Sequence, residues 1–201
     1  MEDNDSKVEF VKKVGDVEVY QNKSLTISSL DVKRDFAKYL EPEQINDVLA
    51  NMPASRDRMM CITLWMSGIR VTELINIKKK DLDFKNQVMT VRWQKNKKWN
   101  NRNVPLHQQL KDMLYIYSGA SNEETLLFSI SRQRVFQITK NWFGISPHQF
   151  RHSFAVNFLR QTKDIVTLHH ILGHSKIQTT MEYLKIVPID QARVLETVKF
   201  T

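Results

Sequence analysis

The periodicity of the apolar residues changes twice along the chain, and this change restricts the fold more than any other feature. Residues 40–67 have helical spacing, residues 82–106 contain two short runs of β-forming side chains, and helical spacing returns from residue 107. Because strand character beyond residue 40 is confined to this one stretch, its strands are expected to pair with each other. The sequence therefore predicts a mainly α fold with a small antiparallel β-sheet (α+β).

The chain divides into three predicted parts. Residues 1–35 form an N-terminal appendage or linker, in which two alternating runs flank Gly15 as in a short β-hairpin. Residues 36–185 form the main domain, and residues 186–201 form a tail with apolar positions. The tail is expected either to be exchanged between protomers or to pack on its own domain, and the two alternatives are about equally favoured.

Helices account for most of the main domain. Pro42 opens the first, at a position where no amide proton is needed, and Met52-Pro53 ends it. A second, at 56–67, carries few charges and stops at Gly68, which is typical of a buried central helix. Further helices are predicted at 107–117, 132–142, 147–161, 165–172 and 177–184.

The charge is consistent with a polyanionic partner. Thirty Lys and Arg residues against 22 Asp and Glu give a formal net charge of +8, with basic clusters at 78–80 and 95–102. Such clusters bind nucleic acid, although many basic proteins carry only a solvated basic face, so the charge alone does not decide. The single cysteine, Cys61, lies in an apolar run and is expected to be a buried thiol. Without a signal peptide or a long apolar run, the protein is expected to be cytoplasmic, with no membrane partner.

Four separate stretches hold basic or nucleophilic residues at notable spacing. Their motifs are Gly-x-Arg-x-x-Glu-Leu at 68–74, His-x-Phe-Arg-His-Ser-Phe-Ala at 148–155, Leu-Gly-His-Ser at 172–175, and Tyr183, which follows His174 by nine residues. In the first, Arg70 follows a buried helix and Glu73 lies one turn further on. In the second, His148 and Arg151 share one helical face, because three residues are close to one turn.

Taken together and in this order, the motifs resemble the signature of the tyrosine recombinases, the phage-integrase type of DNA recombinase. The match covers about residues 40–183. The resemblance implies the catalytic-domain fold of that family and cleavage and rejoining of DNA through a phosphotyrosine. It also implies double-stranded DNA as the partner, and a homo-tetramer on DNA that is a monomer or weak oligomer without it. Because the phosphotyrosine conserves the energy of the cleaved bond, neither ATP nor another cofactor is expected.

The expected chemistry is a transesterification at a phosphodiester. Tyr183 is the nucleophile, whose phenol loses its proton as it attacks. Negative charge develops on the non-bridging oxygens in the transition state. Arg70 and Arg151 are expected to clamp these oxygens, because guanidinium groups bind phosphate bidentately and stay charged.

Two histidines and a lysine complete the expected catalytic set. His148 assists the deprotonation of the tyrosine, and His174 donates a hydrogen bond to a non-bridging oxygen. In the family, a lysine on the β-hairpin loop protonates the leaving 5′-oxygen. Lys95 is the expected equivalent here, with Lys97 as a close rival.

Each residue also has a plainer interpretation. His148 and His152 have the spacing of a zinc site, but Gln149 stands where the metalloprotease motif requires Glu, so no metal site is expected. His152 is expected to pack or face solvent, with a buttressing role as the alternative. Glu73 is expected to orient its neighbours, and Lys78–Lys80 to form a solvated face or a phosphate contact.

Two classes of function remain. The leading hypothesis is a site-specific recombinase or integrase, with type IB topoisomerases and telomere resolvases as enzymes of related chemistry. The competing hypothesis is a helical DNA-binding module without catalysis. The resemblance implies an additional N-terminal helical domain in complete recombinases. The chain is therefore expected to be either a fragment or a minimal enzyme that uses its hairpin-like N-terminus and lysine loop to hold DNA.

Overall fold

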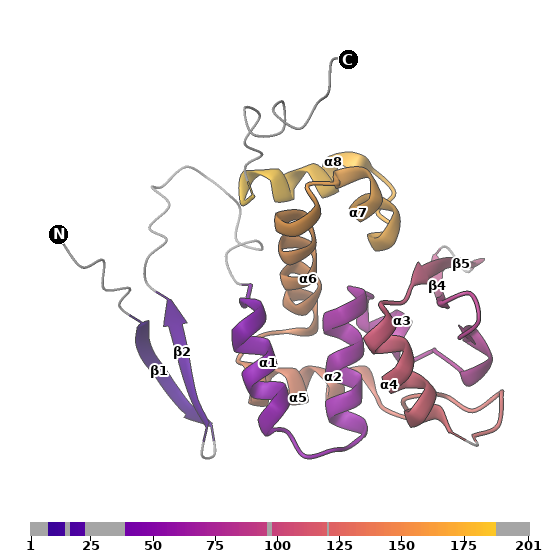
Figure 1. Cartoon of the computed structure of the whole chain (residues 1–201), viewed down its shortest axis with the longest axis horizontal. Coiled ribbons are helices and arrows are strands. Elements are labelled where there is room, and N and C mark those ends of the chain that lie inside the picture. Colours follow the sequence, from indigo (N-terminus) through magenta and orange to yellow (C-terminus); the bar gives the residue numbers. More distant parts are fainter. Residues whose placement is uncertain (1–7, 15–16, 23–38, 96–97, 120, 188–201) are drawn as a thin grey trace.

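Figure 1 gives the arrangement of the chain in a computed structural model, which describes residues 8–14, 17–22, 39–95, 98–119 and 121–187. The strands are β1 (Val8–Val14), β2 (Val17–Asn22), β3 (Leu82–Asp83), β4 (Val88–Lys95) and β5 (Lys98–Pro105). The helices are α1 (Pro42–Asn51), α2 (Arg56–Ser67), α3 (Val71–Leu74), α4 (Gln108–Ser118), α5 (Arg132–Phe143), α6 (Pro147–Thr162), α7 (Ile165–Leu172) and α8 (Ile177–Met181). Two 3-10 helices are η1 (Lys79–Asp81) and η2 (Glu182–Lys185). The prediction of a mainly helical fold with a small antiparallel sheet is confirmed.

The N-terminal part contains a two-stranded antiparallel hairpin. β1 pairs with β2 from Val8 opposite Asn22 to Val14 opposite Val17, with an irregularity between Phe10 and Lys12. The intervening Gly15 and the end of the predicted appendage or linker, from residue 23 on, lie outside the described residues.

The main sheet has three antiparallel strands in the order β3-β4-β5. Its inward face carries Met89, Val91 and Val104, which are fully buried. β4 and β5 stay in register up to Lys95 opposite Lys98, so the strands run further into the lysine-rich segment than predicted. A strand ladder is held by backbone hydrogen bonds and needs no apolar alternation. The mostly polar residues at 98–103 therefore gave no strand signal in the sequence.

α2 is the central helix of the larger core cluster. The Ser55 side chain accepts a hydrogen bond from the Arg58 amide at its start, and Gly68 ends it with φ of 62°, a conformation that glycine adopts at little cost. Cys61 is fully buried in it, as expected. α2 packs against α1, α4, α5 and α6, so nearly all of its surface is covered (Figure 1).

α6 joins this core to a second, smaller one. Phe150, in its first half, belongs to the larger cluster, whereas Val156 and Leu159 pack with Leu168 and Leu172 of α7. Tyr183 is part of the second cluster. Figure 1 shows α6 running from the larger helical group to α7 and α8. The single helix predicted at 177–184 is instead α8 followed by η2, and this tighter turn carries Tyr183.

No helix in the described part of the chain is long and apolar enough to span a lipid bilayer.

Candidate active site

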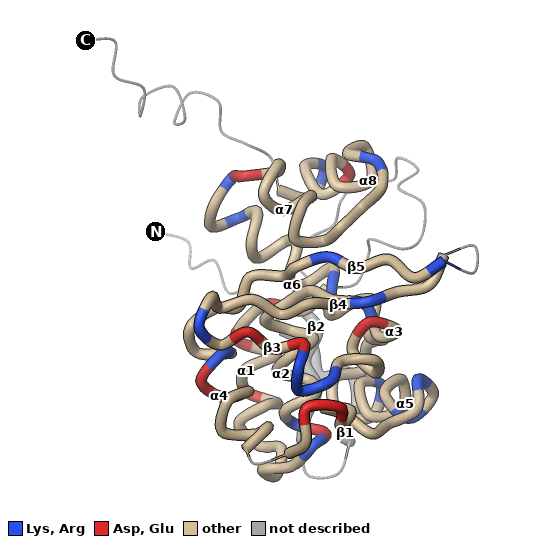
Figure 2. Tube along the Cα trace, turned by 90° about the vertical axis from the view of Figure 1, so that its right-hand side faces the viewer, with Lys and Arg blue, Asp and Glu red and all other residues tan. Residues whose placement is uncertain are grey.

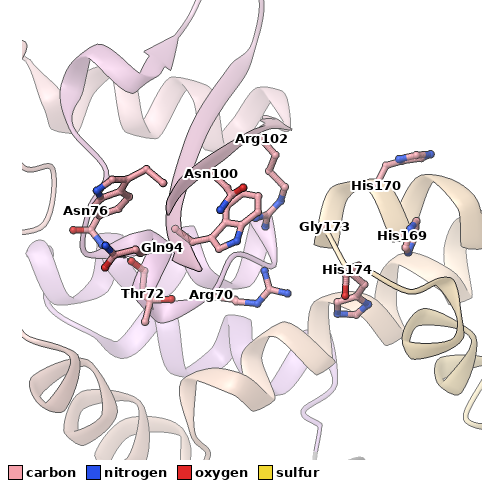
Figure 3. Close-up of a pocket in the computed structure, with 13 residues that line it drawn as sticks. Arg70, Thr72, Asn76, Gln94, Asn100, Arg102, His169, His170, Gly173 and His174 are labelled. Carbon is pink, nitrogen blue, oxygen red and sulfur yellow. Dashed lines mark hydrogen bonds between the residues drawn. The ribbon is translucent and has the colours of Figure 1, made fainter. Parts of the chain in front are cut away.

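A basic cavity of about 860 Å³ lies between the β4–β5 hairpin and the end of α7. Figure 3 shows Arg70 and Arg102 on one side of it and His169, His170 and His174 on the other. Trp93 and Trp99 also line it, and the Trp99 side chain is 62% exposed. Lys and Arg residues lie along β4 and β5 in Figure 2. A cavity with this lining suits an anion with an attached ring or sugar.

Arg70 is held by a buried carboxylate. Glu73 is fully buried, and its Oε2 accepts a 2.8 Å hydrogen bond from the Arg70 amide while its Oε1 pairs with Arg70 Nη1 at 2.9 Å. Arg70 directly precedes α3, so one turn of helix brings the carboxylate back to it. Glu73 therefore orients its neighbours, as expected, and the Arg70 guanidinium stays fixed at the edge of the cavity.

Arg102 is a site residue that the sequence analysis missed. Its Nη2 donates to Glu73 Oε2 at 3.0 Å and its Nε donates to the Ile171 carbonyl at 3.2 Å. Gly173 fits beneath it: a Cβ at that position would lie 2.6 Å from Arg102 Cδ. One signal was present in the sequence, because strand alternation puts Arg102 on the same face as Val104. An arginine on the buried face of a strand needs a buried carboxylate.

Arg151 connects the two sides of the cavity from below. It is 1% exposed, and its Nη1 and Nη2 donate to the carbonyls of Gly68 and Leu172 at 2.8 and 2.7 Å. These carbonyls precede Arg70 and His174 by two residues each. Burial, together with the charge of Arg70, lowers the pKa of Arg151 to about 9, so the guanidinium is still protonated at neutral pH.

Tyr183 lies inside the protein with its hydroxyl on a histidine. It is 2% exposed, and a 2.7 Å hydrogen bond joins its Oη to His152 Nδ1. Burial raises the pKa of Tyr183 to about 12, although the charges of Arg151 and Arg70 act in the opposite direction. Both cations are thus near enough to favour the phenolate, but burial outweighs them in the absence of DNA.

His152 is therefore buried and does not face solvent, as the packing and buttressing interpretations both require. Burial, followed by the charges of His148 and Arg151, lowers its pKa to about 4. His148 is exposed, and the centroids of the His148 and His152 rings are 4.4 Å apart in an edge-on arrangement. The imidazole hydrogen-bonded to the phenol is thus that of His152, which lies on α6 one turn after His148.

His174 lines the cavity and is anchored from behind. Its Nδ1 lies 2.9 Å from Oγ1 of the buried Thr180. Burial, then the charges of Arg151 and Arg70, lowers the pKa of His174 to about 3, so its imidazole is neutral at neutral pH. The structure thus gathers Arg70, Arg151 and His174 around one place, and Tyr183 is close enough to share their electrostatic field.

The predicted lysines lie in two places, the β4–β5 hairpin and the segment at 78–80. Lys95 ends β4, but its side chain lies outside the described residues, as does the whole of Lys97. Among the earlier lysines, Lys78 and Lys80 pair with Glu124, and Lys79 donates to the carbonyls of Gly119 and Ser121. These pairs lie at the protein surface, which agrees with a solvated face, and the phosphate contact stays a prediction. Within the described ranges, no three His, Cys, Asp or Glu side chains lie close enough to hold a metal ion.

Comparison with known proteins gives the family. The profile described as the phage integrase family matches residues 38–188, which is most of the chain. The chain belongs to this family. Among its relatives, the tyrosine recombinase XerA of Thermococcus kodakarensis is 34% identical over 172 residues, covering 77% of this chain and 60% of the relative.

Solved structures of the phage integrase family have the same fold. The catalytic domain of bacteriophage HP1 integrase superimposes with a TM-score of 0.61 at 25% identity, covering 79% of this chain and 94% of that domain. XerH recombinase, in a pre-cleavage complex with its difH substrate, gives a TM-score of 0.61 at 20% identity, covering 81% of this chain and 54% of that protein. The chain spans 60–65% of the length of three XerA relatives, and so corresponds to part of such a protein.

The buried carboxylate allows a test of the site's architecture. We expect Glu73→Gln to destabilise the protein by about 2–3 kcal/mol, because an amide nitrogen would face guanidinium donors that the carboxylate now accepts from. The measurement is urea unfolding at neutral pH. Glu124→Gln is the matched control, since Glu124 is an exposed carboxylate that also pairs with two cations. An unchanged midpoint in Glu73→Gln would show that Glu73 does not hold the site together.

The same carboxylate gives a pH dependence. Burial by itself raises the pKa of Glu73, but hydrogen bonds and charge from Arg102, and then from Arg70, outweigh burial and lower it below its ordinary 4.5. A depressed folded-state pKa stabilises the protein above the unfolded value, and this stabilisation is lost as the pH falls through the folded value. Wild type should therefore lose more stability than Glu73→Gln when the pH is taken well below 4.5.

Proposed function

We propose that the chain is the catalytic part of a site-specific DNA recombinase that cuts and rejoins strands through a 3′-phosphotyrosine at Tyr183. The observation that carries the proposal is that four distant sequence stretches meet at one basic cavity or close behind its lining. Arg70 and His174 line this cavity, Arg151 hydrogen-bonds to the backbone beneath it, and Tyr183 lies within reach of the same charges. A protein that only bound DNA would have no use for a tyrosine beside a phosphate clamp.

The proposed reaction exchanges one phosphoester for another. Tyr183 Oη attacks the phosphorus, the bond to the 5′-oxygen breaks, and the phenol proton leaves as the new bond forms. Arg70 and Arg151 neutralise the extra charge on the non-bridging oxygens. Lys95 donates a proton to the leaving 5′-oxygen. The reverse attack by a 5′-hydroxyl reseals the strand and frees the tyrosine.

The phenol proton has an acceptor close by. His152 is hydrogen-bonded to the Tyr183 hydroxyl, and the exposed ring of His148 lies against His152. His148 remains the proposed residue that assists deprotonation, since it is the imidazole of this pair that solvent and DNA can reach. Because Tyr183 is 2% exposed, its hydroxyl must become accessible to DNA before it attacks a phosphate.

The partner proposed is double-stranded DNA, with a homo-tetramer assembled on it and a monomer or weak oligomer in its absence, in the cytoplasm. XerH, whose fold this chain shares, was solved bound to its DNA substrate. Exchange of the tail between protomers also remains a proposal, because residues 188–201 lie outside the described part of the chain. A type IB topoisomerase or a telomere resolvase would use the same chemistry on a different DNA substrate.

The test of this function is trapping with a nicked suicide substrate. After cleavage the short fragment diffuses away, resealing fails, and protein stays attached to the labelled strand on a denaturing gel. We expect attachment at a 3′ end. Hydrolysed DNA without attached protein would instead indicate a nuclease, and binding without any cleavage would indicate the non-catalytic module. Relaxation of supercoiled DNA lacking a specific site would favour the topoisomerase.

Binding to DNA should be weak and sensitive to salt. With about four phosphate contacts, the affinity is expected to fall roughly 100-fold between about 50 and 200 mM salt, since each contact releases condensed counterions. The measurement is fluorescence anisotropy across a salt series. Lys98→Ala, at the exposed end of the hairpin, should reduce the slope by about one. Lys111→Ala, on α4 beside Asp112, is the control and should leave the slope unchanged. Tight binding that persists in high salt would contradict this prediction.

A further inference from the structure

One hydroxyl group lies between two histidines at the edge of the cavity. Oγ1 of Thr180, on α8, is 3.1 Å from His169 Nδ1 and 2.9 Å from His174 Nδ1. The threonine is fully buried, whereas both imidazoles line the cavity. Neither Thr180 nor His169 has a part in the reaction proposed above. Their arrangement nevertheless restricts where the proton of His174 can reside.

The restriction follows from counting protons. A hydroxyl has one hydrogen to donate, and it can also accept. Within the described part of the chain, the Thr180 hydroxyl pairs with these two nitrogens alone. To satisfy both, it must donate to one Nδ1 and accept a hydrogen from the other. Only two polarities are therefore possible along the row His169, Thr180 and His174.

The two polarities leave His174 with opposite properties at the cavity. Its imidazole is neutral because burial and the nearby Arg151 and Arg70 disfavour a further positive charge, so it carries a single N–H. If Thr180 donates to Nδ1, this hydrogen is on Nε2 and can be given to an anion. If Thr180 accepts from Nδ1, a bare lone pair on Nε2 would meet the anion instead.

The lining of the cavity selects between them. Arg70 and Arg102 lie across from His174 in Figure 3, so an anion bound to them would meet the His174 ring. A lone pair directed at an anionic oxygen is repulsive, whereas an N–H donor in a site with little water stabilises developing charge. The first polarity is thus the one that suits the cavity. This polarity requires a hydrogen on His169 Nδ1, which is present both in the cationic imidazole and in one of the two neutral tautomers.

We propose that Thr180 is a positioning residue which donates its hydroxyl hydrogen to His174 Nδ1, accepts one from His169 Nδ1, and so keeps the His174 proton on Nε2 for a non-bridging phosphate oxygen. The identification of the anion as a phosphate rests on the proposed function, whereas the location of the His174 proton does not. Thr180 acts through His174 and touches no substrate. The role needs a hydroxyl at this position and does not need the methyl group.

The first test measures the proton directly. The full chain, labelled with ¹⁵N in histidine and free of DNA, is studied by NMR, with the His174 signals assigned from their loss in His174→Gln. We expect Nδ1 of His174 to show the chemical shift of an unprotonated nitrogen and Nε2 to show an attached hydrogen. A proton on Nδ1 overturns the proposal. Because no DNA is present, this result stands apart from whether the chain cleaves DNA at all.

The second test compares three variants in the suicide-substrate assay. Thr180→Val keeps the side-chain shape and removes the hydroxyl, so covalent attachment should slow by about 10-fold or more, with DNA affinity nearly unchanged. Thr180→Ser keeps the hydroxyl and should stay within about threefold of wild type. Thr179→Val, at an exposed neighbouring position, is the matched control. A Val variant as fast as wild type, or a Ser variant as slow as Val, contradicts the role.

The two tests separate the possible failures. If Thr180→Val does not fold, the NMR result on wild type and Thr180→Ser decides alone. If wild type forms no covalent complex, the proposed function fails while the proton on Nε2 is still observed.

Discussion

Tyr183→Phe should abolish covalent attachment of the chain to a nicked DNA substrate while leaving a folded protein that binds the same DNA. No other atom of the side chain can replace the phenolic oxygen, because it forms the bond to phosphorus in the proposed reaction. The expected loss is therefore complete within the detection limit of a denaturing gel.

The variant should remain folded because the ring stays in place. Tyr183 packs in the smaller core cluster, and Phe preserves that packing while losing the hydrogen bond to His152. Loss of one such bond costs about 1 kcal/mol, a small part of a typical domain stability. Urea unfolding and DNA anisotropy measured on the same preparation establish that attachment, and not the fold, has been lost.

Tyr115→Phe is the matched control. Tyr115 is 65% exposed on α4, away from the cavity, so its hydroxyl should be dispensable. If attachment persists in Tyr183→Phe and disappears in another tyrosine variant, the nucleophile has been misassigned. If both variants attach DNA normally, the covalent link does not use either phenol.

Arg151→Ala should affect stability and chemistry together. The guanidinium is buried and satisfies the carbonyls of Gly68 and Leu172, which come from opposite sides of the cavity. Its removal leaves two buried acceptors and an empty space, for which a loss of about 3–5 kcal/mol in unfolding free energy is expected. In the proposed reaction Arg151 is one of two cations that clamp the phosphate, so the folded fraction should cleave DNA at least on the order of 100-fold more slowly.

Arg151→Lys separates the two effects. Lysine restores the charge, but a single ammonium lacks the planar fork that bonds two carbonyls and still presents donors to a phosphate. We expect it to recover part of the stability and little of the cleavage rate. Urea unfolding gives the first quantity and the rate of covalent attachment gives the second.

Arg134→Ala controls for the loss of an arginine as such. Arg134 is exposed on α5, and within the described residues its guanidinium makes one hydrogen bond, from Nη1 to the Gln137 side chain at 3.4 Å. Its removal should change stability by less than about 0.5 kcal/mol. An Arg151→Ala protein as stable as Arg134→Ala would mean that the buried guanidinium does not join the two sides of the cavity.

Sequence periodicity was a reliable guide wherever local interactions decide. The central helix at 56–67 has a cap at Ser55, a left-handed glycine at its end and apolar residues on nearly every side, and each of these is visible in the chain itself. The strand ladder beyond residue 98 and the switch from α8 to η2 were not predicted. Both depend on backbone pairing or on packing by distant segments, which leave little trace in local composition.

For the candidate site, the sequence by itself determined the types and order of the reactive residues, because motif spacing within each stretch is fixed by one turn of helix. Only the tertiary structure decided which groups meet. Arg102 of β5 reaches Glu73 on α3 and Ile171 on α7. Arg151 links the carbonyls at positions 68 and 172, and Thr180 lies between two histidines. A buried charge or hydroxyl needs a hydrogen-bond partner, and in these three cases the fold supplies that partner from other segments of the chain.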